Sequence, residues 1–215
     1  MPYKNSIKHY LEDYHYHLYA RGINKMMIFK SSSDYKYFEY LLEKYLTYGF
    51  VEKSKIGHYE VLKVSNSVSE HIDLNCYALM PNHFHLLCKN KSISGITLLM
   101  RRINTAYSSY FNKKYGRRGP LIEGCYKAVL MKTEAQFIHL SRYIHLNPVT
   151  GYLTEKPEDY SFSSYGIYLG REKSDFIEPS LIMENFSTPD KYRSFVEDRK
   201  DYQRVLQELR HFVLE

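Results

Sequence analysis

Short stretches rich in apolar and aromatic residues, some of them alternating with polar positions, are typical of β-strands. We expect about five strands, at residues 13–20, 57–64, 72–80, 83–89 and 126–132. Pro81 and Asn82 favour a turn between the third and fourth of these stretches. We therefore expect the strands at 72–80 and 83–89 to lie side by side in an antiparallel sheet.

Longer stretches place apolar residues three or four positions apart, which is the spacing along one face of a helix. The predicted helices cover residues 31–50, 92–116 and 133–147, with one or two more in the charged segment 188–215. Gly49 ends the first helix, and Thr133 with Gln136 forms a capping box at the start of the third. Because proline disfavours helical geometry in the residue before it, Pro148 is expected to end that helix.

Helices interleaved with several consecutive strands predict an α+β fold with an antiparallel sheet, and argue against a parallel doubly wound sheet. The chain contains no GxxxxGK[ST] sequence, no GxGxxG after a predicted strand, and no GxSxG. A nucleotide-binding loop of those types and the nucleophile elbow of a hydrolase are therefore not predicted.

The composition, with 44% hydrophobic and 25% charged residues, is that of a globular protein able to bury a core. A length of 215 residues fits one domain with extensions, or at most two small domains. No apolar run approaches the roughly 18 residues of a membrane helix, and the first residues lack the apolar core of a secretory signal. We expect a cytoplasmic protein with no membrane partner. Its three widely spaced cysteines form neither a disulfide framework nor a thiolate zinc site.

The charge and the aromatic residues narrow the class of partner. A net charge of +6 favours a polyanion, which could be nucleic acid or a lipid surface, although it does not require either. The chain has 23 Tyr and 11 Phe but no Trp. Tyrosines beside basic residues suit the stacking and phosphate contacts of single-stranded nucleic acid.

His83 and His85 are the first candidates for chemistry. On a strand, residues two apart face the same side with roots roughly 6–7 Å apart, so the two imidazoles could bind one metal ion, with Phe84 in the opposite apolar layer. The alternative is a pair of half-exposed strand histidines bonded to neighbours. The spacing alone does not decide, because the chain has a second such pair at His15 and His17.

A partner for these histidines is present in "RYIHLNP", residues 142–148. Tyr143 and Asn147 are four residues apart and share a helix face, which His139 extends by one turn. Asn147 could be a third metal ligand, and Tyr143 could attack a phosphate that the metal polarises, leaving a phosphotyrosine ester. The alternative is a core tyrosine and an asparagine that caps the helix.

The chain's cations near these motifs are candidate contacts to a DNA backbone. They are Arg101, Arg102, Arg117, Arg118 and Lys127. The alternative for the arginines is a solvated helix face. Tyr107 and Tyr110, in the same helix as the first two, are rival nucleophiles.

Four motifs in this order resemble those of the IS200-like Y1 transposases, most closely the REP-associated tyrosine transposases. The motifs are "MPNHFHLL" (80–87), "LMRRINTAYSSYFNKKYGRRG" (99–119), "RYIHLNPVTGYL" (142–153) and "PEDYSFSSY" (157–165). Upstream of them, "YHLYARGINKMMIF" (16–29) also resembles the family's opening strand and turn. The chain departs from the family at Ile122 and Cys125, where relatives usually carry an aromatic residue and an arginine, and at Phe162, where they carry Trp. Residues 51–70 look like an insertion.

The resemblance implies a ferredoxin-like antiparallel sheet covered by helices, as in HUH endonucleases. Residues 1–165 would form the catalytic domain and residues 166–215 a C-terminal helical extension. His83 and His85 would bind a divalent cation, Mg²⁺ or Mn²⁺, together with Asn147, and Tyr143 would be the nucleophile.

The implied activity is that of a transposase that cleaves and rejoins single-stranded, hairpin-bearing DNA through a covalent 5′-phosphotyrosine intermediate, as a monomer or a homodimer. Three alternatives remain open: a relative that binds DNA without catalysis, an HUH replication initiator or relaxase, and an unrelated zinc hydrolase.

Overall fold

The computed structural model describes residues 10–56 and 59–198. Its centre is an antiparallel sheet with the strand order β4-β5-β1-β6. The strands are β1 (Tyr14–Arg21), β4 (Ile72–Met80), β5 (His83–Asn90) and β6 (Lys127–Leu130). The turn at Pro81 and Asn82 joins β4 to β5 as expected, and the order is that of a ferredoxin-like split βαβ arrangement. The predicted α+β class is confirmed.

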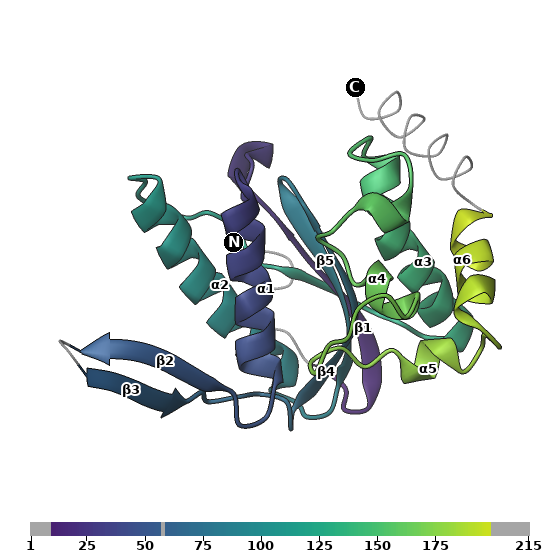
Figure 1. The fold of residues 1–215 in the computed structure, drawn as a ribbon, viewed down its shortest axis with the longest axis horizontal. Helices are drawn as coiled ribbons and strands as arrows, with labels where there is room; N and C mark the ends of the chain where they lie inside the picture. Colours follow the sequence, from purple (N-terminus) through teal and green to yellow (C-terminus); the bar gives the residue numbers. More distant parts are fainter. Residues whose placement is uncertain (1–9, 57–58, 199–215) are drawn as a thin grey trace, which may run out of the picture.

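Two long helices cover one face of the sheet. They are α1 (Ser32–Leu46) and α2 (Gly95–Lys114), and Figure 1 shows them side by side on the same side of the strands. Leu18 of β1 and Phe84 of β5 are fully buried in the core that these helices close. Because side chains alternate along a strand, the neighbours of Leu18 and Phe84 face the other side of the sheet.

That other face is covered by α3 (Glu134–Thr150) and by three shorter helices. These are α4 (Tyr165–Tyr168), α5 (Ser180–Met183) and α6 (Pro189–Glu197), which Figure 1 shows on the same side as α3. Leu87 of β5, Ile144 of α3 and Tyr192 of α6 belong to one buried cluster. The domain boundary at residue 165 stays a prediction.

Pro148 does not end α3, so that expectation was wrong. The helix continues to Thr150, although Pro148 has no N–H to give to the carbonyl of Ile144. The loss is confined to the last turn, where Gly151 N–H donates to Asn147 O and Leu153 N–H donates to Pro148 O. These bonds satisfy carbonyls that a helix end leaves open, so the proline is tolerated there.

The strand predicted at 57–64 lies outside the main sheet. It is β3 (Tyr59–Val64), which pairs only with the unpredicted strand β2 (Val51–Ile56). Figure 1 shows this hairpin standing away from the body of the molecule. That residues 51–70 are an insertion relative to the family stays a prediction.

Two 3₁₀ turns complete the described fold, η1 (Ile23–Lys25) and η2 (Pro157–Asp159). Of the helices expected in 188–215, the structure describes α6, and residues 199–215 lie outside the described part of the chain. Within the part that is described, no helix is long and apolar enough to cross a membrane.

Candidate functional site

His83 and His85 begin β5 and face α3. Their ring centroids are 4.9 Å apart, and Phe84 between them points into the core on the α1 and α2 side. His85 is buried, with 6% of its surface exposed, whereas His83 is half-buried. The two imidazoles therefore share one face of the sheet, as their spacing predicts.

Tyr143 and Asn147 approach this pair from α3. The ring centroids of Tyr143 and His85 are 5.7 Å apart, and Asn147, one turn further along α3, lies near the side chain of His83. The amide nitrogen of Asn147 donates to the carbonyl oxygen of Tyr143, 3.3 Å away. This bond leaves the amide oxygen as the end of Asn147 that is available to a ligand. The residues predicted from two separate motifs are thus brought together.

The other predicted residue of that helix face is not part of this group. Nδ1 of His139 lies 2.7 Å from Nη2 of Arg142, and its ring centroid is 5.6 Å from that of Phe195 on α6. His139 therefore lies against α6.

His17 belongs to the site although the sequence did not single it out. Its Nε2 lies 2.8 Å from Nδ1 of His85, and its ring centroid is 6.3 Å from that of Tyr143. The neighbouring His15 points to the same face but packs on Phe137, with ring centroids 4.1 Å apart. The signal in the sequence was the second histidine pair, but only the register of β1 against β5 shows which member meets His85.

Burial keeps these imidazoles neutral. Burial lowers the pKa of His17 to about 4 and that of His83 to about 4. Burial also lowers the pKa of His85 well below its usual range, and the neighbouring rings of His17 and His83 lower it further. A neutral imidazole has a free nitrogen lone pair, so His83 and His85 are in the state that binds metal at physiological pH.

The donor set fits a divalent cation. Nδ1 of His83 lies 2.6 Å from Oδ1 of Asn82, which can only accept, so the proton of His83 lies on Nδ1 and the lone pair on Nε2. Two imidazole nitrogens and the Asn147 amide oxygen suit Mn²⁺ or Zn²⁺, and also Mg²⁺ if water or phosphate oxygens complete its shell. Among residues 10–56 and 59–198, no group of three or more His, Cys, Asp or Glu side chains is placed to hold a metal, so Asn147 is needed.

The predicted DNA-contacting cations do not lie together. Lys127 is on β6, and its Nζ lies 5.8 Å from the ring centroid of Tyr19, which is itself 5.9 Å from that of His85. Arg101 and Arg102 are on α2, on the opposite side of the sheet.

The other two arginines follow α2. Arg117 donates to Oδ1 of Asn112 and to the carbonyl oxygen of Pro120, and Arg118 is exposed in the same loop. Of the predicted cations, Lys127 is therefore the one placed beside the histidines.

The rival tyrosines are also on the opposite side. Tyr107 is buried, and its hydroxyl donates to the carbonyl oxygen of Ile28. Tyr110 donates to Oδ1 of Asp34 at the start of α1. Neither side chain faces the histidines of β5, whereas Tyr143 does.

The three positions at which the chain departs from the family pattern lie away from the candidate site. Ile122 is buried and its backbone forms a bridge with Gly22, and Cys125 is exposed. Phe162 stacks on Tyr35 with ring centroids 4.0 Å apart. These three residues are not among the side chains that surround His83 and His85.

Known proteins are similar to this chain in sequence family and in fold. A family model described as "Transposase IS200 like" matches residues 10–147. A solved structure of a REP-associated tyrosine transposase bound to a REP hairpin is similar in fold, with a TM-score of 0.56 at 13% sequence identity. The similarity covers 78% of this chain and 86% of that chain. A search of curated proteins finds no match.

Proposed function

The chain belongs to the IS200-like transposase family, and from this premise we propose that it cleaves and rejoins single-stranded, hairpin-bearing DNA through Tyr143. One observation carries the proposal: α3 presents the phenol of Tyr143 to the face of β5 that bears His83 and His85. The proposed nucleophile and the proposed metal ligands come from distant parts of the chain and lie close together, which supports covalent phosphoryl transfer at this place.

The chemistry follows from the positions of these side chains. The phenolic oxygen of Tyr143 gives up its proton to water and forms a bond to phosphorus, and the bond from phosphorus to the 3′ oxygen breaks. That oxygen leaves as a 3′-hydroxyl after taking up a proton, and the 5′ phosphate stays on the tyrosine. Rejoining reverses the step: a 3′-hydroxyl of another strand end attacks the phosphotyrosine and releases Tyr143.

His83, His85 and Asn147 would hold the divalent cation, Mg²⁺ or Mn²⁺. When bound, the cation supplies positive charge at the scissile phosphate. Asn82 holds the proton of His83 on Nδ1, which keeps Nε2 free as a ligand. The strand and the helix that carry these groups would fix their positions relative to a bound phosphate and to the phenol of Tyr143.

The first test is whether the wild-type chain forms a covalent adduct. The chain is incubated with labelled single-stranded oligonucleotides that carry a hairpin, in Mg²⁺ or Mn²⁺, and is then denatured. We expect a labelled protein band that resists denaturation, and its formation is expected to stop when a chelator is added.

The products separate the rival functions. A transposase joins the cleaved ends of one strand to those of another, whereas a replication initiator or relaxase reseals one strand. DNA binding without adduct on every hairpin-bearing strand tried would show a non-catalytic relative, and the proposal would be wrong.

Lys127 is proposed to bind a DNA phosphate beside the reacting one, because it lies next to Tyr19 and so next to the histidines. We expect Lys127→Gln to weaken DNA binding and to reduce the slope of log affinity against log salt by about one. The measurement is fluorescence anisotropy over a series of salt concentrations. Lys36→Gln is the matched control, because Lys36 is exposed on α1, across the sheet from the site. Equal slopes for the two variants would contradict this role for Lys127.

A further inference from the structure

His17 is the histidine of the site to which the proposed function gives no role. It comes from β1, and its Nε2 lies 2.8 Å from Nδ1 of His85. We propose that His17 is a positioning residue: it holds the proton of His85 on Nδ1 and so leaves Nε2 free to bind the cation. This inference rests on the proposed metal site at His83, His85 and Asn147.

A single proton lies between the two rings. A neutral imidazole carries one N–H, so one of the two facing nitrogens donates and the other accepts. If His17 donates, the proton of His85 is on its Nε2, which then has no lone pair for a metal. If His85 donates, its Nε2 is free. A metal bound through Nε2 of His85 therefore requires His17 to be the acceptor.

The same arrangement occurs at the other ligand. Nδ1 of His83 lies 2.6 Å from Oδ1 of Asn82, which leaves Nε2 of His83 free. With His17 as the acceptor, both histidines have their Nδ1 engaged by a neighbour and their Nε2 available. Outer partners of this kind orient a metal-binding imidazole and set which nitrogen carries its proton.

The surroundings of His17 hold its ring in place. It lies between His85 and Tyr19, with ring centroids 5.0 Å and 4.9 Å away, and the planes of its ring and that of His85 differ by 25°. In the register of the sheet His17 pairs with Leu87, and Tyr19 pairs with His85. The side chains of His17, Tyr19 and His85 therefore share the face toward α3. The contact to His85 therefore depends on strand pairing and not on a mobile loop.

His15 provides a matched control within the same strand. It faces the same side two residues earlier, where it packs on Phe137, and its buried Nε2 has no hydrogen-bond partner. Replacing His15 by Phe removes an imidazole from the same layer without touching the contact to His85. Any effect common to the loss of a buried histidine will therefore appear in both variants.

The test uses the full chain without DNA and Mn²⁺ alone as the probe, with binding measured by calorimetry. We expect His17→Phe to bind Mn²⁺ about 10- to 100-fold more weakly than wild type. His17→Gln, whose amide oxygen can accept from His85, is expected to recover most of that affinity. His15→Phe is expected to bind as wild type does. Nitrogen NMR of the metal-free wild-type chain is expected to show the proton of His85 on Nδ1.

Three results would overturn the inference. The first is a folded His17→Phe chain that binds Mn²⁺ as tightly as the wild type does. The second is an NMR signal that places the proton of His85 on Nε2 in the wild type. The third is a wild-type chain that does not bind Mn²⁺. If His17→Phe does not fold, His17→Gln and the wild-type NMR signal still decide. The proposed function fails separately: a wild-type chain that binds Mn²⁺ but forms no DNA adduct contradicts the enzyme and leaves the role of His17 standing.

Discussion

Tyr143→Phe is expected to abolish the covalent protein–DNA adduct while leaving DNA affinity within about twofold of wild type. The substitution removes only the hydroxyl that would attack phosphorus. The ring remains, so its packing against His85 and His17 is retained, with wild-type ring centroids 5.7 Å and 6.3 Å away. The adduct is measured on a denaturing gel with labelled hairpin-bearing DNA, and binding is measured by anisotropy under native conditions.

Tyr110→Phe is the matched control. It also removes one tyrosine hydroxyl, but from α2, across the sheet from His85. We expect it to form the adduct at the wild-type level. An adduct that persists in Tyr143→Phe would place the nucleophile elsewhere, and loss of the adduct in Tyr110→Phe alone would point to that side of the sheet. Loss of DNA binding together with the adduct in Tyr143→Phe would show a structural tyrosine.

The parts of the fold that the sequence predicted are those set by local patterns. The strands that became β4 and β5 are continuous apolar runs separated by Pro81 and Asn82, so both their type and their pairing could be inferred. The four-residue spacing of Tyr143 and Asn147 placed them on one helix face, because helix geometry relates neighbours directly. That this face meets His83 and His85 was expected from the resemblance and not from the spacing.

The parts that were missed depend on pairing between distant segments. His15 and His17 are equivalent in the sequence, and the register of β1 against β5 alone brings His17 to His85. The strand β2 was missed for a different reason: its sequence is largely polar, and its strand character rests on its pairing with β3. The prediction that Pro148 ends its helix was wrong because proline is tolerated in a last turn, where carbonyl groups lack helical partners in any case.

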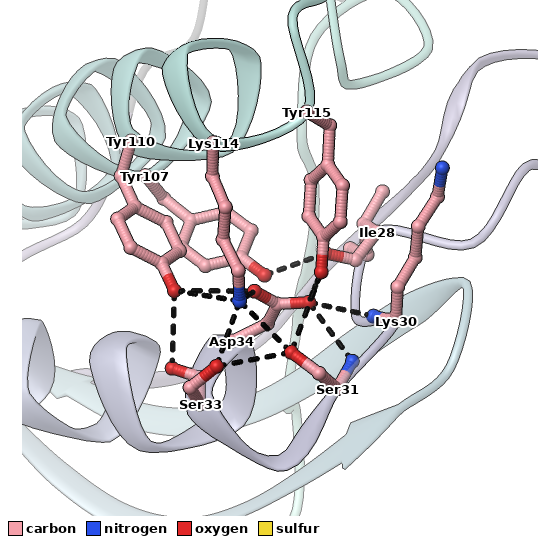
Figure 2. A network of polar contacts seen from close by, with 9 residues as sticks. All are labelled: Ile28, Lys30, Ser31, Ser33, Asp34, Tyr107, Tyr110, Lys114 and Tyr115. Carbon is pink, nitrogen blue, oxygen red and sulfur yellow. Dashed lines mark hydrogen bonds and ion pairs between the residues drawn. The ribbon is translucent and has the colours of Figure 1, made fainter.

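Asp34 makes contacts both within its own helix start and with a distant helix, and the distant contacts could not be predicted from the sequence. Its Oδ2 accepts from the backbone N–H groups of Lys30 and Ser31 at the start of α1, 2.8 Å and 3.0 Å away. Figure 2 shows that the same carboxylate also binds side chains of α2. Lys114 donates to its Oδ1 at 2.5 Å and Tyr115 to its Oδ2 at 2.7 Å. Asp34 therefore joins the start of one helix to the end of another.

Asp34→Ala is expected to lower the free energy of unfolding by about 2–3 kcal/mol, because a carboxylate that accepts several hydrogen bonds, one of them from the partly exposed Lys114, is lost. The carboxylate is fully buried, so its loss leaves an internal space and backbone donors without their acceptor. The measurement is urea unfolding at neutral pH. Asp190→Ala is the matched control: Asp190 is also in the first turn of a helix, but its side chain is 80% exposed and pairs with Arg193 in the same turn. We expect that variant to lose less than about 1 kcal/mol.

The pH dependence gives a second and independent signature of Asp34. Burial alone would raise the pKa of its carboxyl group, but the bonds from Lys114 and Tyr115 and from the Lys30 and Ser31 backbone lower it to about 2. An unfolded aspartate has a pKa of about 3.9, so the unfolded chain binds the proton first as the pH falls. The contribution of Asp34 to stability is therefore complete above about pH 4 and is lost as the pH falls toward 2. Wild type and Asp190→Ala should both show this decline in urea midpoint, and Asp34→Ala should show less of it. Equal declines in all three chains would contradict the lowered pKa of Asp34 and the stabilising role of its contacts with Lys114 and Tyr115.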